Sequence, residues 1–191
     1  MCSKLMSHLK KVPKEKIVSI PQGINILIVK DSMDNLYLLI KSSSGKNKLL
    51  IPKEIYLFKD NKNLRIGLKS YFLKEKHLLG SFYTFVRQKI RGLIQGFNKE
   101  LQLVGVGFRA SVKKDSLILS IGYSHKVNIH FNKDLKIVCT SPKTIFIKGR
   151  NLYEVGQKAA EIRSKRVPEP YKGKGIFYKG ERIQKKEGKK L

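Results

Sequence analysis

Apolar residues recur at helical spacing in two stretches of the chain, and each stretch follows a series of short apolar runs of strand length. The first stretch covers residues 82–97 and the second covers residues 152–162. Such a stripe is typical of a helix that buries one face. The same order of elements therefore occurs twice, which indicates an internal duplication. It predicts an α+β fold of two duplicated small domains, each a mostly antiparallel sheet packed against one helix.

Local patterns assign the elements of each half. In the first half, strands are expected at residues 23–30, 36–41, 49–51, 55–58 and 64–68. The helix that follows has an apolar stripe of Phe82, Phe85, Val86, Ile90, Leu93, Ile94 and Phe97. In the second half, strands are expected at residues 102–113, 117–123, 127–131, 135–140 and 144–148. Strict alternation in the second of these runs predicts one shared face for Leu117, Leu119, Ile121 and Tyr123.

The second helix is expected to begin after Asn151, a good N-cap, with Glu154 in capping-box position. Its buried stripe is predicted to consist of Leu152, Val155, Ala159 and Ile162. Pro168 prevents the helix from continuing. These patterns predict a first domain at residues 1–99, a second domain at residues 100–167 and a basic C-terminal extension at residues 168–191.

The charge balance restricts the partners of the chain. Forty-one Lys and Arg face fourteen Asp and Glu, so the formal net charge is +27. Self-repulsion of that size opposes a compact state, and a polyanionic partner would neutralise it. Hydrophobic residues make up 41% of the sequence, which is enough for folded cores. We therefore expect a folded protein that binds nucleic acid, with a merely solvated, highly soluble surface as the alternative.

Other classes of function lack a supporting motif. No apolar run approaches the roughly 20 residues that span a bilayer, and Cys2 and Cys139 lie far apart without a ligand-like spacing. Residues 105–110 match a dinucleotide-binding loop in letters, but a strand rather than a helix is expected after them. Ser124 and His125 adjoin without an orienting carboxylate, and the histidines show no metal spacing. We expect no enzyme activity, cofactor, metal, membrane contact or small-molecule substrate.

Residues 163–191 combine positive charge with aromatic side chains and glycine. Their acidic residues are only Glu169, Glu181 and Glu187, and the aromatic side chains of Tyr171, Phe177 and Tyr178 are interleaved with the cations. Cations for phosphates and aromatics for stacking suit a nucleic-acid backbone, and a disordered basic tail is the alternative. Removal of residues 168–191 is expected to weaken RNA binding and to leave both folded cores intact.

Several motifs in the second half resemble the bacterial-type large-subunit ribosomal protein six family, and they occur in the family's order. The motifs are GVGFRA at residues 105–110, GYSH at 122–125, VGQKAAEIR at 155–163, PEPYKGKGI at 168–176 and KEGKK at 186–190. The resemblance is strong from about residue 101 onward and weak before it. Lys126 stands where the family often has proline, and Phe177 stands where arginine is common.

The resemblance implies two duplicated α+β domains, binding to large-subunit rRNA mainly through the second, and a position near the base of the acidic stalk and the factor-binding region. Neighbouring ribosomal proteins are implied as partners, and a homo-oligomer is not expected. Together with the tail chemistry, it predicts a set of rRNA-binding residues, here called the predicted contact set: Arg109, Ser124, His125, Lys126, Lys158, Arg163, Lys165, Arg166, Tyr171, Lys172, Lys174, Tyr178, Lys179, Arg182, Lys185, Lys186, Lys189 and Lys190.

The sequence leaves two alternative functions open and also bears on the compartment. An architectural nucleic-acid-binding protein outside the ribosome has the same charge, and an RNA-modifying enzyme would need a cofactor loop or nucleophile that the motifs do not supply. An excess of Lys, Ile and Asn indicates an AT-rich genome, and residues 1–16 resemble neither a signal peptide nor a transit peptide. These features favour a mitochondrial matrix ribosome and an organelle-encoded protein, with the bacterial cytoplasm or a plastid as alternatives.

Overall fold

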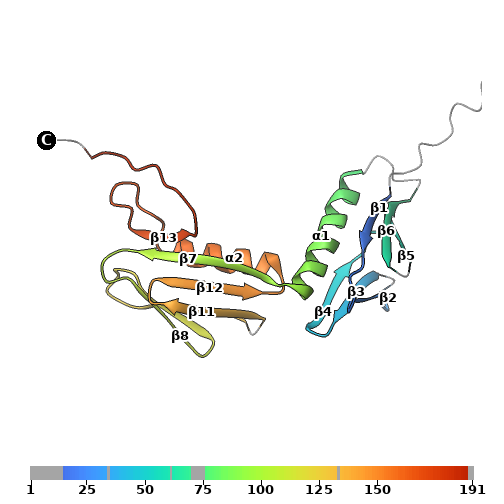
Figure 1. Ribbon diagram of the computed structural model, residues 1–191, viewed down its shortest axis with the longest axis horizontal. Coiled ribbons are helices and arrows are strands. Elements are labelled where there is room, and N and C mark those ends of the chain that lie inside the picture. Colours follow the sequence, from blue (N-terminus) through green and yellow to red (C-terminus); the bar gives the residue numbers. More distant parts are fainter. Residues whose placement is uncertain (1–14, 34, 61, 70–75, 133, 189–191) are drawn as a thin grey trace, which may run out of the picture. The chain divides into compact units, whose positions relative to one another are not determined.

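The computed structural model describes residues 15–33, 35–60, 62–69, 76–132 and 134–188. Two compact units, residues 1–94 and residues 95–191, make up the chain (Figure 1). Each unit has its own buried core.

The first unit consists of six strands followed by a helix. The strands are β1 (Lys16–Ser19), β2 (Asn25–Lys30), β3 (Leu36–Ser42), β4 (Gly45–Leu50), β5 (Ile55–Lys59) and β6 (Asn63–Leu68), and the helix is α1 (Lys76–Ile94). They form two antiparallel sheets of order β1-β6-β5 and β2-β3-β4. Helix α1 packs against strands of both sheets and closes the core between them.

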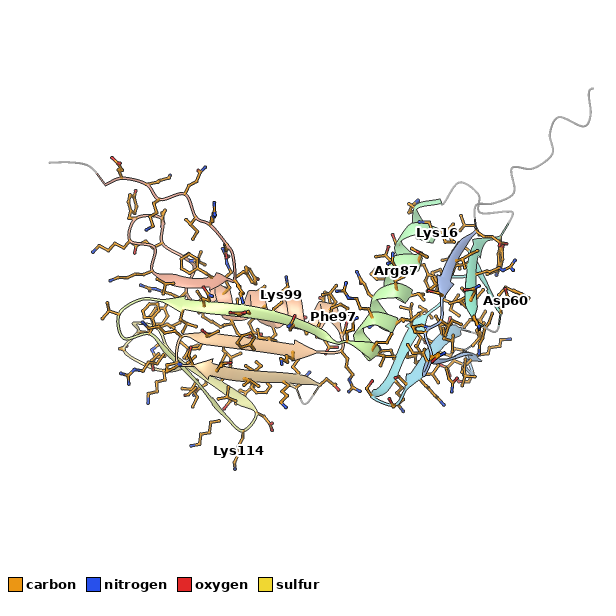
Figure 2. All side chains as sticks on the ribbon, in the orientation of Figure 1. Lys16, Asp60, Arg87, Phe97, Lys99 and Lys114 are labelled. Atoms are coloured by element: carbon orange, nitrogen blue, oxygen red, sulfur yellow. The ribbon has the colours of Figure 1, made fainter. Side chains whose placement is uncertain are left out.

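The predicted apolar stripe of α1 is buried only in part, because Phe85 and Ile94, both expected on it, are 51% and 53% exposed. Leu79, Phe82, Val86, Ile90 and Leu93 all lie in the core of the first unit. Phe97 was expected on the same stripe, and this expectation is wrong. The helix ends at Ile94, Gly96 has a φ of +68°, and Phe97 begins the next strand (Figure 2). A positive φ at a glycine terminates helices because it costs no Cβ clash.

The second unit repeats this plan and adds one strand. It contains β7 (Phe97–Val104), β8 (Arg109–Lys113), β9 (Ser116–Ser120), β10 (Val127–His130), β11 (Leu135–Ser141), β12 (Thr144–Gly149), α2 (Leu152–Ser164) and β13 (Gly175–Tyr178). The sheet orders are β11-β12-β7-β13 and β10-β9-β8. Thus β7-β12-β11 corresponds to β1-β6-β5, and β8-β9-β10 corresponds to β2-β3-β4. The predicted α+β fold of duplicated sheet-and-helix domains is confirmed.

Two strand predictions in the second unit are wrong, and glycine explains both. The run 102–113 is split into β7 and β8 by a turn in which Gly107 has a φ of +73°. Phe108 folds into the core there, and a Cβ at Gly105 would stand 2.9 Å from its ring. The strand expected at 117–123 ends at Ser120, and Tyr123 is 45% exposed rather than on the core face. It follows Gly122, whose φ of +81° turns the chain outward.

Helix α2 begins as predicted. The Tyr153 backbone N–H donates to Asn151 Oδ1 at 3.3 Å, and Asn151 Nδ2 donates to Glu154 Oε1 at 2.8 Å. Val155, Ala159 and Ile162 are buried, while Leu152 at the first position is only partly covered. The helix packs on β7, β12 and β13. The buried face of α2 therefore begins at Val155, the second residue of the predicted stripe.

Part of the basic C-terminal segment is built into the second unit. Strand β13 pairs antiparallel with β7, with Ile176 opposite Leu103. Ile176 is fully buried in the core. Hence the expectation that residues 168–191 could be removed without damage to either core is wrong, because the deletion would take a sheet strand and a core side chain with it.

Candidate nucleic-acid interface

The loop between β9 and β10 meets the C-terminal end of α2. The Tyr123 hydroxyl donates to the Lys165 carbonyl oxygen at 3.0 Å, and the Arg166 guanidinium carbon lies 5.3 Å from the centre of the Tyr123 ring. The Tyr123 and His125 rings are stacked, with centroids 6.1 Å apart and an interplanar angle of 15°. A cation over an aromatic face adds attraction to this contact. We call Tyr123, His125, Lys165 and Arg166 the loop–helix cluster.

Tyr123 thus brings the predicted residue His125 to the predicted residues Lys165 and Arg166, which lie about 40 positions further along the chain. Ser124, His125, Lys126 and Lys165 are exposed, and Arg166 is half-buried. Tyr123 was missed by the sequence reasoning, because the alternation of the preceding strand placed it inward. The signal that could have found it was the glycine directly before it. Gly122 ends the alternation and leaves an aromatic ring at the surface.

Arg109 lies at the same end of its sheet as this loop. It begins β8 and pairs with Ser120, which is two residues before Gly122. Its side chain is exposed. The register therefore places one more predicted cation at the end of the sheet from which residues 122–126 leave.

Arg163 is occupied by an internal ion pair. Its Nη2 lies 2.6 Å from Glu181 Oε1 and its Nε lies 3.3 Å from Glu181 Oε2. The Tyr178 backbone N–H also donates to Glu181 Oε2, at 2.9 Å. The hydrogen bond from Arg163, with that from Tyr178, lowers the pKa of Glu181, and the same hydrogen bond raises the pKa of Arg163. The pair ties the residues after β13 to helix α2.

Three further members of the predicted contact set have internal partners. Lys158 Nζ donates to Glu161 Oε2 at 2.7 Å and to the His130 carbonyl oxygen at 3.0 Å. Lys179 Nζ lies 2.8 Å from Glu100 Oε2 on β7. Tyr178 packs against the core of the second unit. These side chains help to hold the second unit together. The pairing of Lys179 with Glu100 could not be predicted from local sequence patterns, because the partners come together only in the folded unit.

The rest of the C-terminal segment folds back on itself. Glu169 N–H donates to the Lys174 carbonyl oxygen at 2.8 Å, and Lys186 N–H donates to the Pro170 carbonyl oxygen at 3.1 Å. The end of the described chain therefore lies beside the loop that precedes β13 (Figure 1). Lys174 is half-buried, and the exposed members of the predicted contact set here are Tyr171, Lys172, Arg182, Lys185 and Lys186. Lys189 and Lys190 lie outside the described residues.

The described residues offer few features for other chemistry. Within the described ranges, no three His, Cys, Asp or Glu side chains gather in a way that could hold a metal ion. In the same part of the chain, no helix is both long and apolar enough to cross a membrane. The dinucleotide-like residues 105–110 form the turn into strand β8 instead of opening a helix.

Comparison with known proteins gives consistent matches over most of the chain. The family described as ribosomal protein L6 matches residues 104–179. A large ribosomal subunit protein uL6 from Nitrosococcus oceani is 39% identical over 91% of this chain and 95% of its own length. The uL6 proteins of Xanthobacter autotrophicus and Bacillus cereus are 37% and 35% identical over 97% and 92% of this chain, and over 99% and 96% of their own lengths. The chain belongs to the ribosomal protein L6 (uL6) family.

Proposed function

We propose that this protein is a structural constituent of the large ribosomal subunit and that its second unit binds large-subunit rRNA. One observation supports the second part most directly. The loop–helix cluster gathers cations and aromatic rings on one surface, and it lies within the residues that match the family. Exposed cations beside aromatic rings suit phosphates and unstacked bases.

The proposed interface divides the predicted contact set into two roles. Exposed or half-buried side chains contact RNA: Arg109, Ser124, His125, Lys126, Lys165, Arg166, Tyr171, Lys172, Lys174, Arg182, Lys185 and Lys186. Lys158, Arg163, Tyr178 and Lys179 instead position the helix and the C-terminal segment through their internal contacts. Lys189 and Lys190 join the first group by charge alone. In this scheme the family's motifs serve both to bind RNA and to shape the surface that binds it.

The protein's position on the ribosome, its protein partners and its compartment are part of the same proposal. We propose a position near the stalk base and the factor-binding region, contacts with neighbouring ribosomal proteins, a monomeric chain and no catalysis. The relatives named above are bacterial, which agrees with the bacterial cytoplasm. A mitochondrial ribosome stays a prediction from composition, as does a plastid, and sequencing the genome that encodes the chain would decide among them.

Sedimentation of a cell extract tests the proposed function. The full chain should travel with the large subunit and stay there through a second gradient. The purified chain should also prefer a structured large-subunit RNA fragment over duplex DNA of equal length in a competition assay. A chain that sediments apart from ribosomes and binds both nucleic acids equally would support the alternative, an architectural nucleic-acid-binding protein outside the ribosome.

A further inference from the structure

The sheet β2-β3-β4 of the first unit has one face in the core and one face outside. Ile26, Leu38 and Ile40 point into the core and are at most 1% exposed. The strand register places the outer residues in three rows. The first row is Asn25, Lys41 and Lys46; the second is Leu27, Leu39 and Lys48; the third is Val29, Tyr37 and Leu50. We call these nine positions the outer face.

The outer face is apolar at one end and cationic at the other. Leu27, Val29 and Leu50 are 45%, 44% and 52% exposed. Lys48 Nζ lies 3.6 Å from the centre of the Tyr37 ring, so the only aromatic ring of the face already has a cation over it. The nine positions, all of which the structure describes, include no carboxylate.

The duplicated unit shows that the fold does not require apolar residues on such a face. The outer positions of the corresponding sheet β8-β9-β10 are Arg109, Ser111, Lys113, Ser116, Ile118, Ser120, Asn128 and His130. Only one of these is apolar, as is usual for an antiparallel sheet with one face in water. The two sheets share their topology but differ in the chemistry of the outer face. The fold therefore does not explain why the outer face of β2-β3-β4 is apolar, and we look for the explanation in a binding partner.

We propose that the outer face is a docking surface for another protein, and that the docked segment combines apolar side chains with Asp or Glu. The apolar rows would bury the partner's apolar side chains, which stabilises association in proportion to the area removed from water. Lys41, Lys46 and Lys48 would meet its carboxylates and fix its orientation. The proposal concerns the first unit and is independent of RNA binding by the second.

Two other occupants fit the outer face less well. RNA would leave the leucine and valine side chains against a charged backbone, where their burial gains nothing from the phosphates. A second copy of this chain brings a formal charge of +27 and the same lysines, so its approach is opposed by repulsion. A protein segment with both apolar and acidic side chains can pack on the apolar end of the face and pair with the lysines at its other end.

Photo-crosslinking in intact cells tests the proposal. The full chain would carry p-benzoylphenylalanine in place of Val29, in the apolar row, or in place of Phe85, an exposed apolar residue on α1 that serves as the matched control. We expect a protein adduct at position 29, mapped to a segment that contains apolar residues and Asp or Glu. The additional changes Lys41→Glu and Lys46→Glu should lower its yield about tenfold, the effect of roughly 1.4 kcal/mol.

Four results would overturn the proposal: adducts with RNA, adducts with a second copy, a protein adduct no stronger than at position 85, or a yield that the charge reversal leaves unchanged. Circular dichroism of the purified variants checks that the reversal keeps the fold. Sedimentation of the adduct tests the proposed function independently of the docking surface. An adduct outside the large-subunit fraction would contradict the proposed function and would leave the docking surface supported.

Discussion

At the scale of single residues, the Arg163–Glu181 pair gives a pH-dependent prediction. Glu181 accepts hydrogen bonds from Arg163 and from the Tyr178 backbone, which lowers its pKa. A carboxyl group with a lowered pKa stabilises the fold above its ordinary pKa, 4.5 here, and this stabilisation is lost as the pH falls through the folded-state value. We expect Glu181→Gln to cost about 1 kcal/mol at pH 7 and nearly nothing at strongly acidic pH.

Hydrogen exchange of the β7 and β13 amides measures this difference within the second unit. Glu187→Gln is the matched control, because Glu187 is an exposed carboxylate in the same segment. An equal loss in both variants, or a loss for Glu181→Gln that persists at acidic pH, would show that the ion pair does not stabilise the unit.

The same pair shows where reading the sequence residue by residue fails. The chain displays many cations and few carboxylates, but pairing depends on which side chains the fold brings within hydrogen-bond distance. Arg163 and Glu181 are 18 positions apart, and Lys179 and Glu100 are 79 positions apart. No periodicity reports contacts over such separations. The basic residues of a sequence therefore predict that an interface is positively charged. The fold decides which of these side chains are paired internally and which can contact a partner.

At the scale of elements, the docking of β13 depends on one glycine. Gly175 has a φ of +149°, and a Cβ there would stand 2.5 Å from the backbone Cα of Pro168. Because backbone atoms cannot turn aside as a side chain can, Gly175→Ala should weaken the docking of β13 and cost about 2 kcal/mol or more. The change should raise hydrogen exchange at β13 and in the paired residues of β7. Gly156→Ala in α2 is the control: a Cβ there has no neighbour within 4 Å, and the change should be neutral or stabilising. Equal exchange in the two variants would contradict the argument.

The C-terminal segment also allows a truncation that spares the core. Deletion of residues 182–191 keeps β13 and the Arg163–Glu181 pair but removes five cations and one carboxylate. We expect affinity for a large-subunit RNA fragment to fall roughly tenfold at physiological salt, with the thermal unfolding midpoint nearly unchanged. A full-length chain with the same five cations changed to Gln should lose as much affinity. A tenfold loss in the truncated chain alone would assign the effect to the backbone rather than to charge.

Elements were predictable to the extent that local pattern decides them. The α1 helix and the Asn151 cap depend on residues within a few positions of one another. The cap is confirmed, and the α1 stripe is buried at Phe82, Val86, Ile90 and Leu93 but exposed at Phe85 and Ile94. The breaks at Gly96, Gly107 and Gly122 were missed, because a glycine permits a positive φ without requiring one. Strand β13 was read as a tail, since its β pairing is with residues about 70 positions earlier.

At the scale of the whole molecule, charge alone does not favour either unit as the one proposed to bind RNA. Residues 1–94 hold 19 Lys and Arg against 6 Asp and Glu, and residues 95–191 hold 22 against 8. Long-range attraction to a polyanion is therefore shared almost equally by the two units. Both units place cations over aromatic rings, since Lys16 and Arg87 flank the half-buried Tyr83 in the first unit. In the second unit the ring beside Arg166 and His125 is the exposed Tyr123, whereas lysines of the first unit border an apolar surface.

The salt dependence of RNA affinity measures how much each unit contributes to RNA binding. If the chain contacts 6–10 phosphates, its affinity for a large-subunit RNA fragment should fall about 10³–10⁵-fold between 50 and 200 mM salt. Because each phosphate contact contributes nearly one unit to the slope of log affinity against log salt, Arg182→Gln with Lys185→Gln should reduce the slope by about 2. Lys41→Gln with Lys46→Gln removes the same charge from the first unit and should leave the slope unchanged. Equal reductions in both double variants would mean that the two units share the RNA, and a slope near zero for the unchanged chain would refute an electrostatic interface altogether.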